Sequence, residues 1–351
     1  MKNTLTGTGK NITLFLVVIF VITLVSSFFL YSFEKYAFDA ETYKNAFLEK
    51  EVYKRIPATL GEQLVLIANG DGAGLAEENV SNALSVFKNL TAHDWEVFIS
   101  ELLTTEDLKA MSEANIDSIF SYINGNTNNA NISFVVLKDN LESERGVNAV
   151  LALLNEQPTC TLQQVAEMAN SALSGNGLLF CNPPALALEL AKPLIQAQLS
   201  VLNDNIPQEK AYLSRENANE VLVKTQARRM LMRLSPLVPI FLLSVITMIA
   251  VRSTKSWLQW WGIPLLISGG IGLLMSLLTR PLMQAIFDAR ILKASPSGVS
   301  TDMLGLVYDL FDAITQAFTQ QSALLAFYSA LVGLVMLLGV FFLDWRKKSG
   351  A

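Results

Sequence analysis

Four long apolar stretches without a charged side chain constrain this chain more than any other feature of its sequence. No Asp, Glu, Lys, Arg or His lies inside residues 12–33, 237–251, 257–278 or 323–343. A helix needs roughly 20 mostly apolar residues to cross the hydrocarbon core of a bilayer. The second stretch is short, but Leu234, Ser235 and Pro236 extend it. The sequence therefore predicts a four-helix transmembrane bundle built from these segments.

The first apolar stretch has an alternative interpretation as a cleaved signal peptide, because Lys2 and Lys10 precede it. The apolar region of a signal peptide is usually about 7 to 15 residues long and ends at a small-residue cleavage site. Residues 12–33 are longer than that, and no such site follows them. We therefore expect an uncleaved anchor.

The orientation of the spans follows from the basic residues in the short segments that flank them, which favour the cytoplasm. Residues 1–11, 252–256 and 344–351 contain only one acidic residue, Asp344. Their basic residues are Lys2, Lys10, Arg252, Lys255, Arg346, Lys347 and Lys348. Residues 34–235 carry 26 Asp and Glu against 16 Lys and Arg. We predict a plasma-membrane protein with both termini in the cytoplasm and an extracytoplasmic domain over residues 34–236.

The outer domain is expected to be mainly α-helical, because its apolar residues recur with helical spacing. Thr91 and Asp94 form a predicted capping box before one such stripe, and Thr161 and Gln164 before another. Only residues 132–137 are typical of a strand, and residues 124–131 are interpreted as a loop that either connects or binds. Residues 279–322 are expected to form a second outer loop, in which an amphipathic helix over residues 301–318 packs on the outer domain.

The chain has two cysteines, Cys160 and Cys181, and both fall in the predicted outer domain. Extracytoplasmic compartments favour oxidation of paired thiols. The two residues bracket one predicted helix and the turn at 175–177, and prolines flank them. We expect a structural disulfide, with a free reactive thiol as the alternative.

Two further groups of residues are singled out by their position. Small residues spaced by four lie on one face of the third and fourth spans and favour close helix packing, either within the chain or between two copies: Ser268, Gly272, Ser276, Ser329 and Gly333. Three arginines precede the second span and are expected at the outer membrane interface, either snorkelling or contacting lipid phosphate: Arg228, Arg229 and Arg233.

Motifs for catalysis or cofactor binding are missing from the sequence. The single histidine, His93, and the two cysteines cannot supply a tetrahedral zinc site within one chain. No nucleophile elbow, zinc-protease motif, Walker loop or dinucleotide fingerprint occurs. We expect no catalytic residues, no metal, no cofactor and no nucleic acid partner.

Residues 38–64, FDAETYKNAFLEKEVYKRIPATLGEQL, and the later PTC…CNPP pattern resemble segments of uncharacterised bacterial four-span membrane proteins with a large helical extracytoplasmic domain. That resemblance implies a bacterial envelope setting. The order of one span, a large outer domain and three more spans is also similar to lipoprotein-exporter and division-associated permeases. The chain departs from those permeases at residues 252–256, which are too few to form a coupling helix.

The sequence thus favours a non-enzymatic envelope protein whose outer domain mediates protein interaction, assembly or sensing. Its expected partners are membrane lipid and either another protein or a second copy of the chain. The alternative is a permease or accessory subunit of a transport complex. A cytoplasmic ATPase that co-purified with the chain would favour that alternative.

Overall fold

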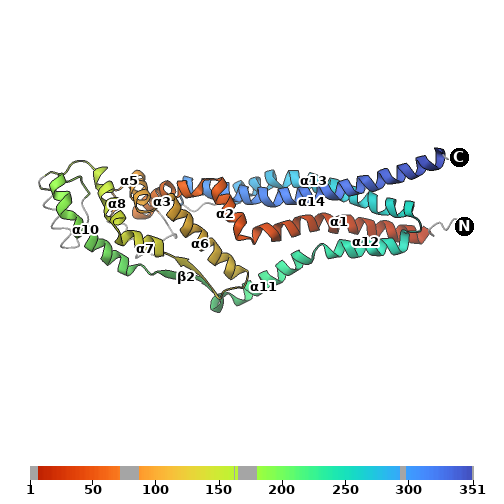
Figure 1. Ribbon diagram of the computed structural model, residues 1–351, viewed down its shortest axis with the longest axis horizontal. Helices are drawn as coiled ribbons and strands as arrows, with labels where there is room; N and C mark the ends of the chain where they lie inside the picture. The colour runs from red at the N-terminus through yellow and green to blue at the C-terminus, as the bar shows by residue number, and fades with distance from the viewer. Residues whose placement is uncertain (1–6, 72–86, 162, 165–179, 293–297, 350–351) are drawn as a thin grey trace. The chain divides into compact units, whose positions relative to one another are not determined.

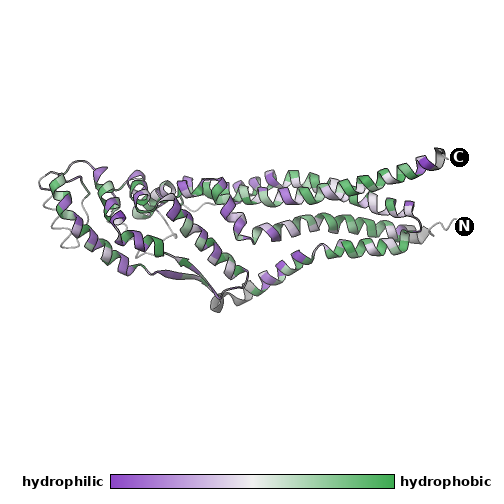
Figure 2. Ribbon diagram, viewed as in Figure 1, coloured by the Kyte–Doolittle hydropathy of each residue, from purple (hydrophilic) through white to green (hydrophobic). Residues whose placement is uncertain are grey.

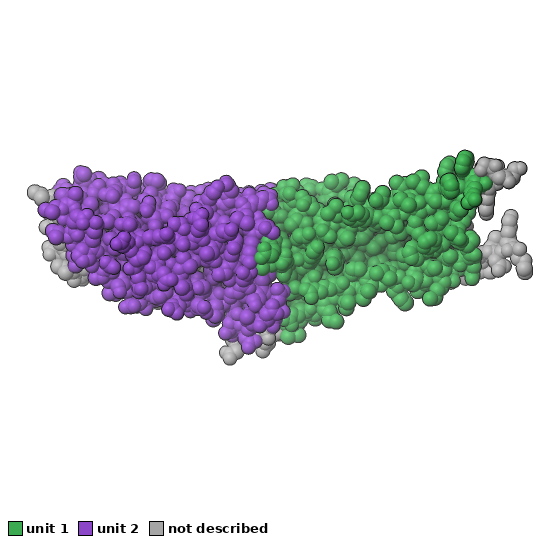
Figure 3. Space-filling model, in the orientation of Figure 1, with its two compact units in different colours: residues 1–42, 218–287, 312–351 green, residues 43–217, 288–311 purple. Residues whose placement is uncertain are grey.

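The computed structural model describes residues 7–71, 87–161, 163–164, 180–292 and 298–349. The described chain is mainly helical and divides into two compact units (Figure 3). Unit 1 comprises residues 1–42, 218–287 and 312–351, and unit 2 comprises residues 43–217 and 288–311. Each unit is therefore assembled from segments that lie far apart in the sequence.

Unit 1 is built from long helices that pack on one another. They are α1 (Gly7–Ala37), most of α11 (Arg215–Leu234), α12 (Leu237–Ala250), α13 (Thr254–Phe287) and the larger part of α14 (Thr301–Ser349) (Figure 1). Helix α1 contacts both α12 and α13. A cluster of Phe20, Ile246 and Ala250 is buried between these helices.

Five helical segments within the described ranges are long and apolar enough to cross a membrane, and they indicate a membrane protein. They are Asn11–Ala37, Ala185–Asn205, Val223–Ala250, Thr254–Arg290 and Thr301–Arg346. Four of them cover the four stretches predicted from the sequence, except that the second ends at Ala250, one residue before the predicted end. Figure 2 shows their apolar colouring along α1, α12, α13 and α14. The additional segment is α10 (Ala185–Asn205), which belongs to unit 2.

Two helices extend well beyond the apolar stretches that predicted them. Helix α13 continues past residue 278 to Phe287, and a π-helical turn, Asp288–Leu292, follows it. Helix α14 begins at Thr301, so it starts 22 residues before the predicted fourth span at residue 323. Most of the predicted outer loop over residues 279–322 is therefore helix.

Unit 2 contains most of α2 (Ala40–Glu49) and all of α3 (Val52–Ala68), α5 (Ala92–Leu102), α6 (Thr105–Ile123), α7 (Val135–Glu142), α8 (Glu144–Asn155) and α10. Its main core gathers leucines of α5, α6, α7, α8 and α10. A second cluster places Trp95 of α5 against Leu153 of α8 and Leu90. At Gly61 of α3 a Cβ atom would lie 2.5 Å from the Ala92 carbonyl oxygen, so glycine allows α3 and α5 to approach closely.

The helix starts of unit 2 follow local sequence signals. The Thr91 hydroxyl accepts a hydrogen bond from the Asp94 N–H, and the Asp94 carboxylate accepts one from the Thr91 N–H. The predicted capping box is therefore confirmed. Thr104 and Asp107 form the same arrangement at the start of α6. Such caps satisfy backbone N–H groups that the first helical turn leaves without partners.

The strand predicted over residues 132–137 is only partly correct. Strand β1 covers Asn129–Ser133, and residues from Val135 onward form α7. β1 pairs antiparallel with β2 (Glu209–Ser214), with a bulge between Ala130 and Asn131. The Asn-rich segment thus supplies part of a strand as well as a turn. Because β2 lacks alternating apolar residues, its sequence carried no strand signal.

The first part of α14 contacts α3 within unit 2, whereas packing of the whole amphipathic segment over residues 301–318 on an outer domain stays a prediction. The Arg55 guanidinium lies 2.6 Å from the Asp309 carboxylate. The Gln63 side chain donates to the Gly298 carbonyl at 2.8 Å and accepts from the Ser300 N–H at 3.1 Å. These contacts hold residues 298–309 on the surface of α3.

Candidate functional site: the clasped helix α10 and the polar hollow of unit 2

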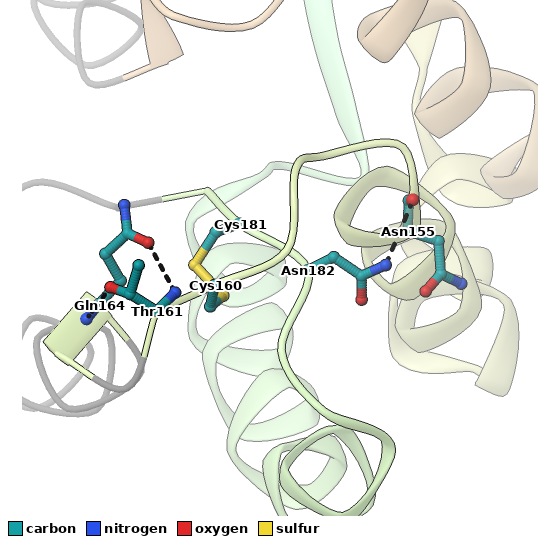
Figure 4. Close-up of a disulfide and its surroundings, with 6 residues drawn as sticks. All are labelled: Asn155, Cys160, Thr161, Gln164, Cys181 and Asn182. Atoms are coloured by element: carbon teal, nitrogen blue, oxygen red, sulfur yellow. Dashed lines mark hydrogen bonds between the residues drawn. A yellow bond between two sulfur atoms is a disulfide. The ribbon is translucent and has the colours of Figure 1, made fainter.

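A disulfide joins Cys160 to Cys181 between α8 and α10 (Figure 4). Backbone hydrogen bonds reinforce this clasp, because the Cys160 N–H donates to the Asn182 carbonyl and the Asn182 N–H donates to the Pro158 carbonyl, each at 2.9 Å. The Asn182 amide reaches the Asn155 carbonyl at the end of α8 at 3.5 Å. The clasp thus holds the chain that leads into α10 beside the end of α8.

The capping pair predicted after Cys160 is also present. The Gln164 side chain accepts from the Thr161 N–H at 2.8 Å, and the Thr161 hydroxyl accepts from the Gln164 N–H at 3.3 Å (Figure 4). The helical stripe expected to follow, with Leu162, Val165, Met168 and Leu173, lies outside the described residues.

Helix α10 uses one face for the core of unit 2. Leu199 lies in the main apolar cluster, and the helix contacts α7 and α8. The Lys138 ammonium donates to the carbonyl oxygens of Asn203 and Ile206, which are at the C-terminal end of α10. The Asn203 amide in turn donates to the Glu142 carboxylate. The clasp at one end and this polar network at the other fix the rotation of α10.

The opposite face of α10 carries an exposed apolar stripe. Leu190 has 71% of its surface exposed, and no charged side chain interrupts the stripe. At 100° per residue its members fall within one sector of the helix. They are Leu186, Leu190, Leu194, Ala197 and Val201, which we call the α10 stripe. Exposed apolar rows of this kind mark sites of interaction with proteins or membranes.

A polar hollow of about 550 Å³ lies where α6 meets β1 and the start of β2. Its lining is mostly amides and hydroxyls and includes one carboxylate, that of Glu209. The lining residues are Ala114, Asn115, Ser118, Thr127, Asn128, Asn129, Asn131, Ser133 and Glu209. This hollow includes residues of the Asn-rich segment that the sequence assigned to a connecting or binding loop.

The three arginines before the second span differ in their surroundings. Arg229 is buried in unit 1, where its guanidinium contacts the Glu34 carboxylate and stacks over the Phe38 ring, with its Cζ 4.4 Å from the ring centroid. Arg233 reaches the same carboxylate but remains mostly exposed. Arg228 is exposed. Contact of these residues with lipid phosphate stays a prediction, and Glu34 is a partner that sequence reasoning missed.

The small residues of α13 and α14 lie where these helices touch. At Gly333 a Cβ atom would lie 2.5 Å from the Leu266 nitrogen, and the Ser329 hydroxyl donates to the Leu265 carbonyl at 3.1 Å. At Gly272 it would meet both Ala326 of α14 and the Phe28 ring of α1. Ser268 and Ser276 are also buried. The spacing of small residues did not single out Gly269, where the backbones of α13 and α14 come closest on this face.

Two groups of unit 2 have displaced pKa values. Burial, and then the nearby Glu113 carboxylate, raise the pKa of Tyr53 to about 12. Burial opposes ionisation of Asp107, but hydrogen bonds from Thr104 and Asn140 and the charge of Arg145 outweigh it and lower the pKa of that carboxyl. Both groups therefore keep their usual charge at neutral pH and act as structural hydrogen-bonding groups.

The residues with known metal chemistry are dispersed. His93 lies exposed at the start of α5, with its Nδ1 3.6 Å from the Glu96 carboxylate. In the described part of the chain, no three His, Cys, Asp or Glu side chains lie together in a group that could hold a metal ion. Comparison with known proteins finds no matching family model, no matching curated protein and no matching solved structure.

Proposed function

We propose that this chain is a non-enzymatic envelope membrane protein that spans the bilayer four times and assembles through its extracytoplasmic domain. The spans are centred on residues 12–33, 237–251, 257–278 and 323–343, and both termini lie in the cytoplasm. The basic residues beside these segments support the orientation. The Cys160–Cys181 disulfide supports an oxidising location for unit 2.

Helix α10 is assigned to the outer domain in this proposal, although it is long enough to cross a membrane. It is the least apolar of the five segments. One face packs on α7 and α8, and the helix as a whole carries the charged residues Glu189, Lys192 and Asp204. Charged side chains are costly within the hydrocarbon core. These features favour an aqueous helix with one apolar face.

The exposed α10 stripe is the observation that carries the assembly proposal, and its spacing favours a second copy of the chain as the partner. Leu186 and Val201 are equally distant from the Pro193–Leu194 bond, and so are Leu190 and Ala197. In an antiparallel pair with a two-fold axis at that bond, each leucine would face the smaller residue of the other copy. Such self-complementarity is what an isologous interface requires.

The charge distribution also fits self-association. The stripe itself has no charged member, and Glu189 on its border is already paired with Lys192 at 2.7 Å. Two copies of α10 can therefore approach without opposing like charges across the stripe. One helix pair buries less than the roughly 800 Å² per partner of a standard interface. We expect weak association that relies on the high effective concentration of membrane-anchored copies.

The test is dimerisation of the full-length protein in lipid bilayers at increasing protein-to-lipid ratio, measured by single-molecule photobleaching. Leu190→Glu places a charge in the stripe and should shift the monomer–dimer equilibrium by at least tenfold towards monomer. Gln196→Glu is the matched control, because this exposed residue lies on another face of α10. It should dimerise like the unmodified protein.

Two outcomes would contradict the proposal. Equal dimerisation of the Leu190→Glu and Gln196→Glu variants would show that the stripe is not the interface. Stoichiometric co-purification of a cytoplasmic ATPase would favour a transport-complex subunit. Only Val251, Arg252 and Ser253 link α12 to α13, which is too little chain for a helix that such an ATPase could hold.

A further inference from the structure

The polar hollow of unit 2 is independent of the α10 stripe and has the volume of a small-molecule site. It is open to solvent and is formed within one chain by α6, β1, the turn before β1 and the first residue of β2. Its volume of about 550 Å³ falls in the range of ligand pockets, about 300 to 1,000 Å³.

The walls of the hollow are held in place by hydrogen bonds that leave other polar atoms free. The Asn115 amide oxygen accepts from the Ser133 N–H at 2.8 Å, and the Ser118 hydroxyl oxygen accepts from the Asn131 N–H at 2.9 Å. These two bonds join α6 to β1. In both bonds the side chain of α6 is the acceptor, so the Asn115 NH₂ group and the Ser118 hydroxyl hydrogen remain available to donate to a ligand.

Asn131 holds the Glu209 carboxylate in place beside the hollow. Its amide nitrogen donates to the Glu209 carboxylate at 2.8 Å, which fixes the orientation of the amide because an ionised carboxylate only accepts. The amide oxygen is then buried, and it has no hydrogen-bond partner in the structure. Buried polar atoms of this kind are uncommon, because leaving them unpaired is unfavourable. Because this oxygen has no contact with solvent, it is not offered to a ligand, and the acceptor that the hollow presents is the Glu209 carboxylate.

The chemistry of the lining restricts the ligand class. No lysine or arginine lines the hollow, so nothing there offsets the charge of a phosphate or a carboxylate ligand. The hollow has only one carboxylate in its lining, whereas a calcium ion is usually coordinated by several acidic side chains. Apart from the Glu209 carboxylate, the lining offers neutral donors and acceptors. Hydroxyl groups match such a lining, because each one both donates and accepts.

We propose that this hollow binds a neutral polyol of the size of a mono- or disaccharide. The Glu209 carboxylate accepts from ligand hydroxyl groups, while the Asn115 amide and the Ser118 hydroxyl donate to them. The site lies wholly within unit 2 of one chain, so binding does not depend on the assembly through α10.

The experiment is saturation-transfer NMR on the full-length protein in a detergent without a sugar head group. The probes are glucose, N-acetylglucosamine, maltose and mannitol at millimolar concentration. At least one probe should bind with a millimolar dissociation constant. Asn115→Asp keeps the oxygen that accepts from Ser133 but removes the free NH₂ donor, so it should weaken binding at least tenfold without loosening the wall.

A second variant and a control make the result decisive. Glu209→Gln replaces an acceptor with a mixed group and should also weaken binding, while Asn124→Ala changes an exposed residue outside the lining and should leave it unchanged. Absence of saturation transfer to all four probes would overturn the proposal. Equal binding by the Asn115→Asp, Glu209→Gln and Asn124→Ala variants would overturn it as well. Dimerisation in bilayers reports separately on the α10 stripe.

Discussion

The Arg229 guanidinium lies 3.1 Å from the Glu34 carboxylate, and this ion pair is buried where α11 meets the end of α1 in unit 1. Both side chains are less than 10% exposed. Arg233 adds a second contact to the same carboxylate oxygen at 2.7 Å. The pair joins residues 195 positions apart in the chain. Arg229 therefore pairs with a side chain of the protein itself, whereas the neighbouring Arg228 is exposed.

Glu34→Ala should destabilise unit 1 strongly, because it leaves the Arg229 cation buried without its carboxylate. Removing one member of a buried ion pair typically costs about 3 to 5 kcal/mol. Unfolding of the detergent-solubilised protein, followed by circular dichroism, measures the loss. Arg228→Ala is the control and should change stability by less than about 0.5 kcal/mol. Equal losses in the two variants would contradict the assigned pair.

Gly269→Ala should destabilise the contact between α13 and α14. Its Cβ atom would lie 2.4 Å from the Ala330 nitrogen, so one helix must move. Overpacking of this kind typically costs about 1 to 3 kcal/mol. Gly270→Ala, one residue along, meets nothing within 4 Å and should be neutral or slightly stabilising. Thermal melting of both variants in the same detergent compares them, and a reversed order would refute the packing.

Replacing Cys160 and Cys181 together by serine should destabilise unit 2 by about 3 kcal/mol, since the bond closes a loop with a sequence separation of 21. Chemical unfolding of the double variant and of the oxidised protein measures the difference. Non-reducing peptide mapping provides the control. Finding both thiols free in protein isolated from the envelope would contradict the disulfide and its predicted oxidising location.

Acidification should weaken unit 2 through Asp107. The pKa of this carboxyl is lowered in the folded state, so its contribution to stability is full above the ordinary aspartate pKa and is lost as pH falls through the lower folded value. Asp107→Asn should lower stability at pH 7 by about 1 kcal/mol, because it removes the negative charge that lies in the first turn of α6 and pairs with Arg145. It should also flatten the acid side of the stability profile. An unchanged profile would exclude this role.

Several features of the protein could be read from the sequence because they depend on neighbouring residues. An apolar stretch is recognised from consecutive residues alone, and the four predicted stretches are helical except for Val251 at the end of the second. The capping box of Thr91 and Asp94 needs residues only three positions apart. The apolar pattern did not predict that α10 has the length and composition of a membrane span, because Glu189, Lys192 and Asp204 interrupt its apolar residues.

Other features were decided only when distant segments met. Strand β2 has no apolar alternation of its own and exists through pairing with β1. Gly269 and Gly270 are adjacent and identical in type, but only Gly269 faces α14. The polar hollow requires α6, β1 and Glu209 together. Helix caps and apolar runs are local interactions, whereas ion pairs, close helix contacts and binding sites depend on which faces the folded chain brings together.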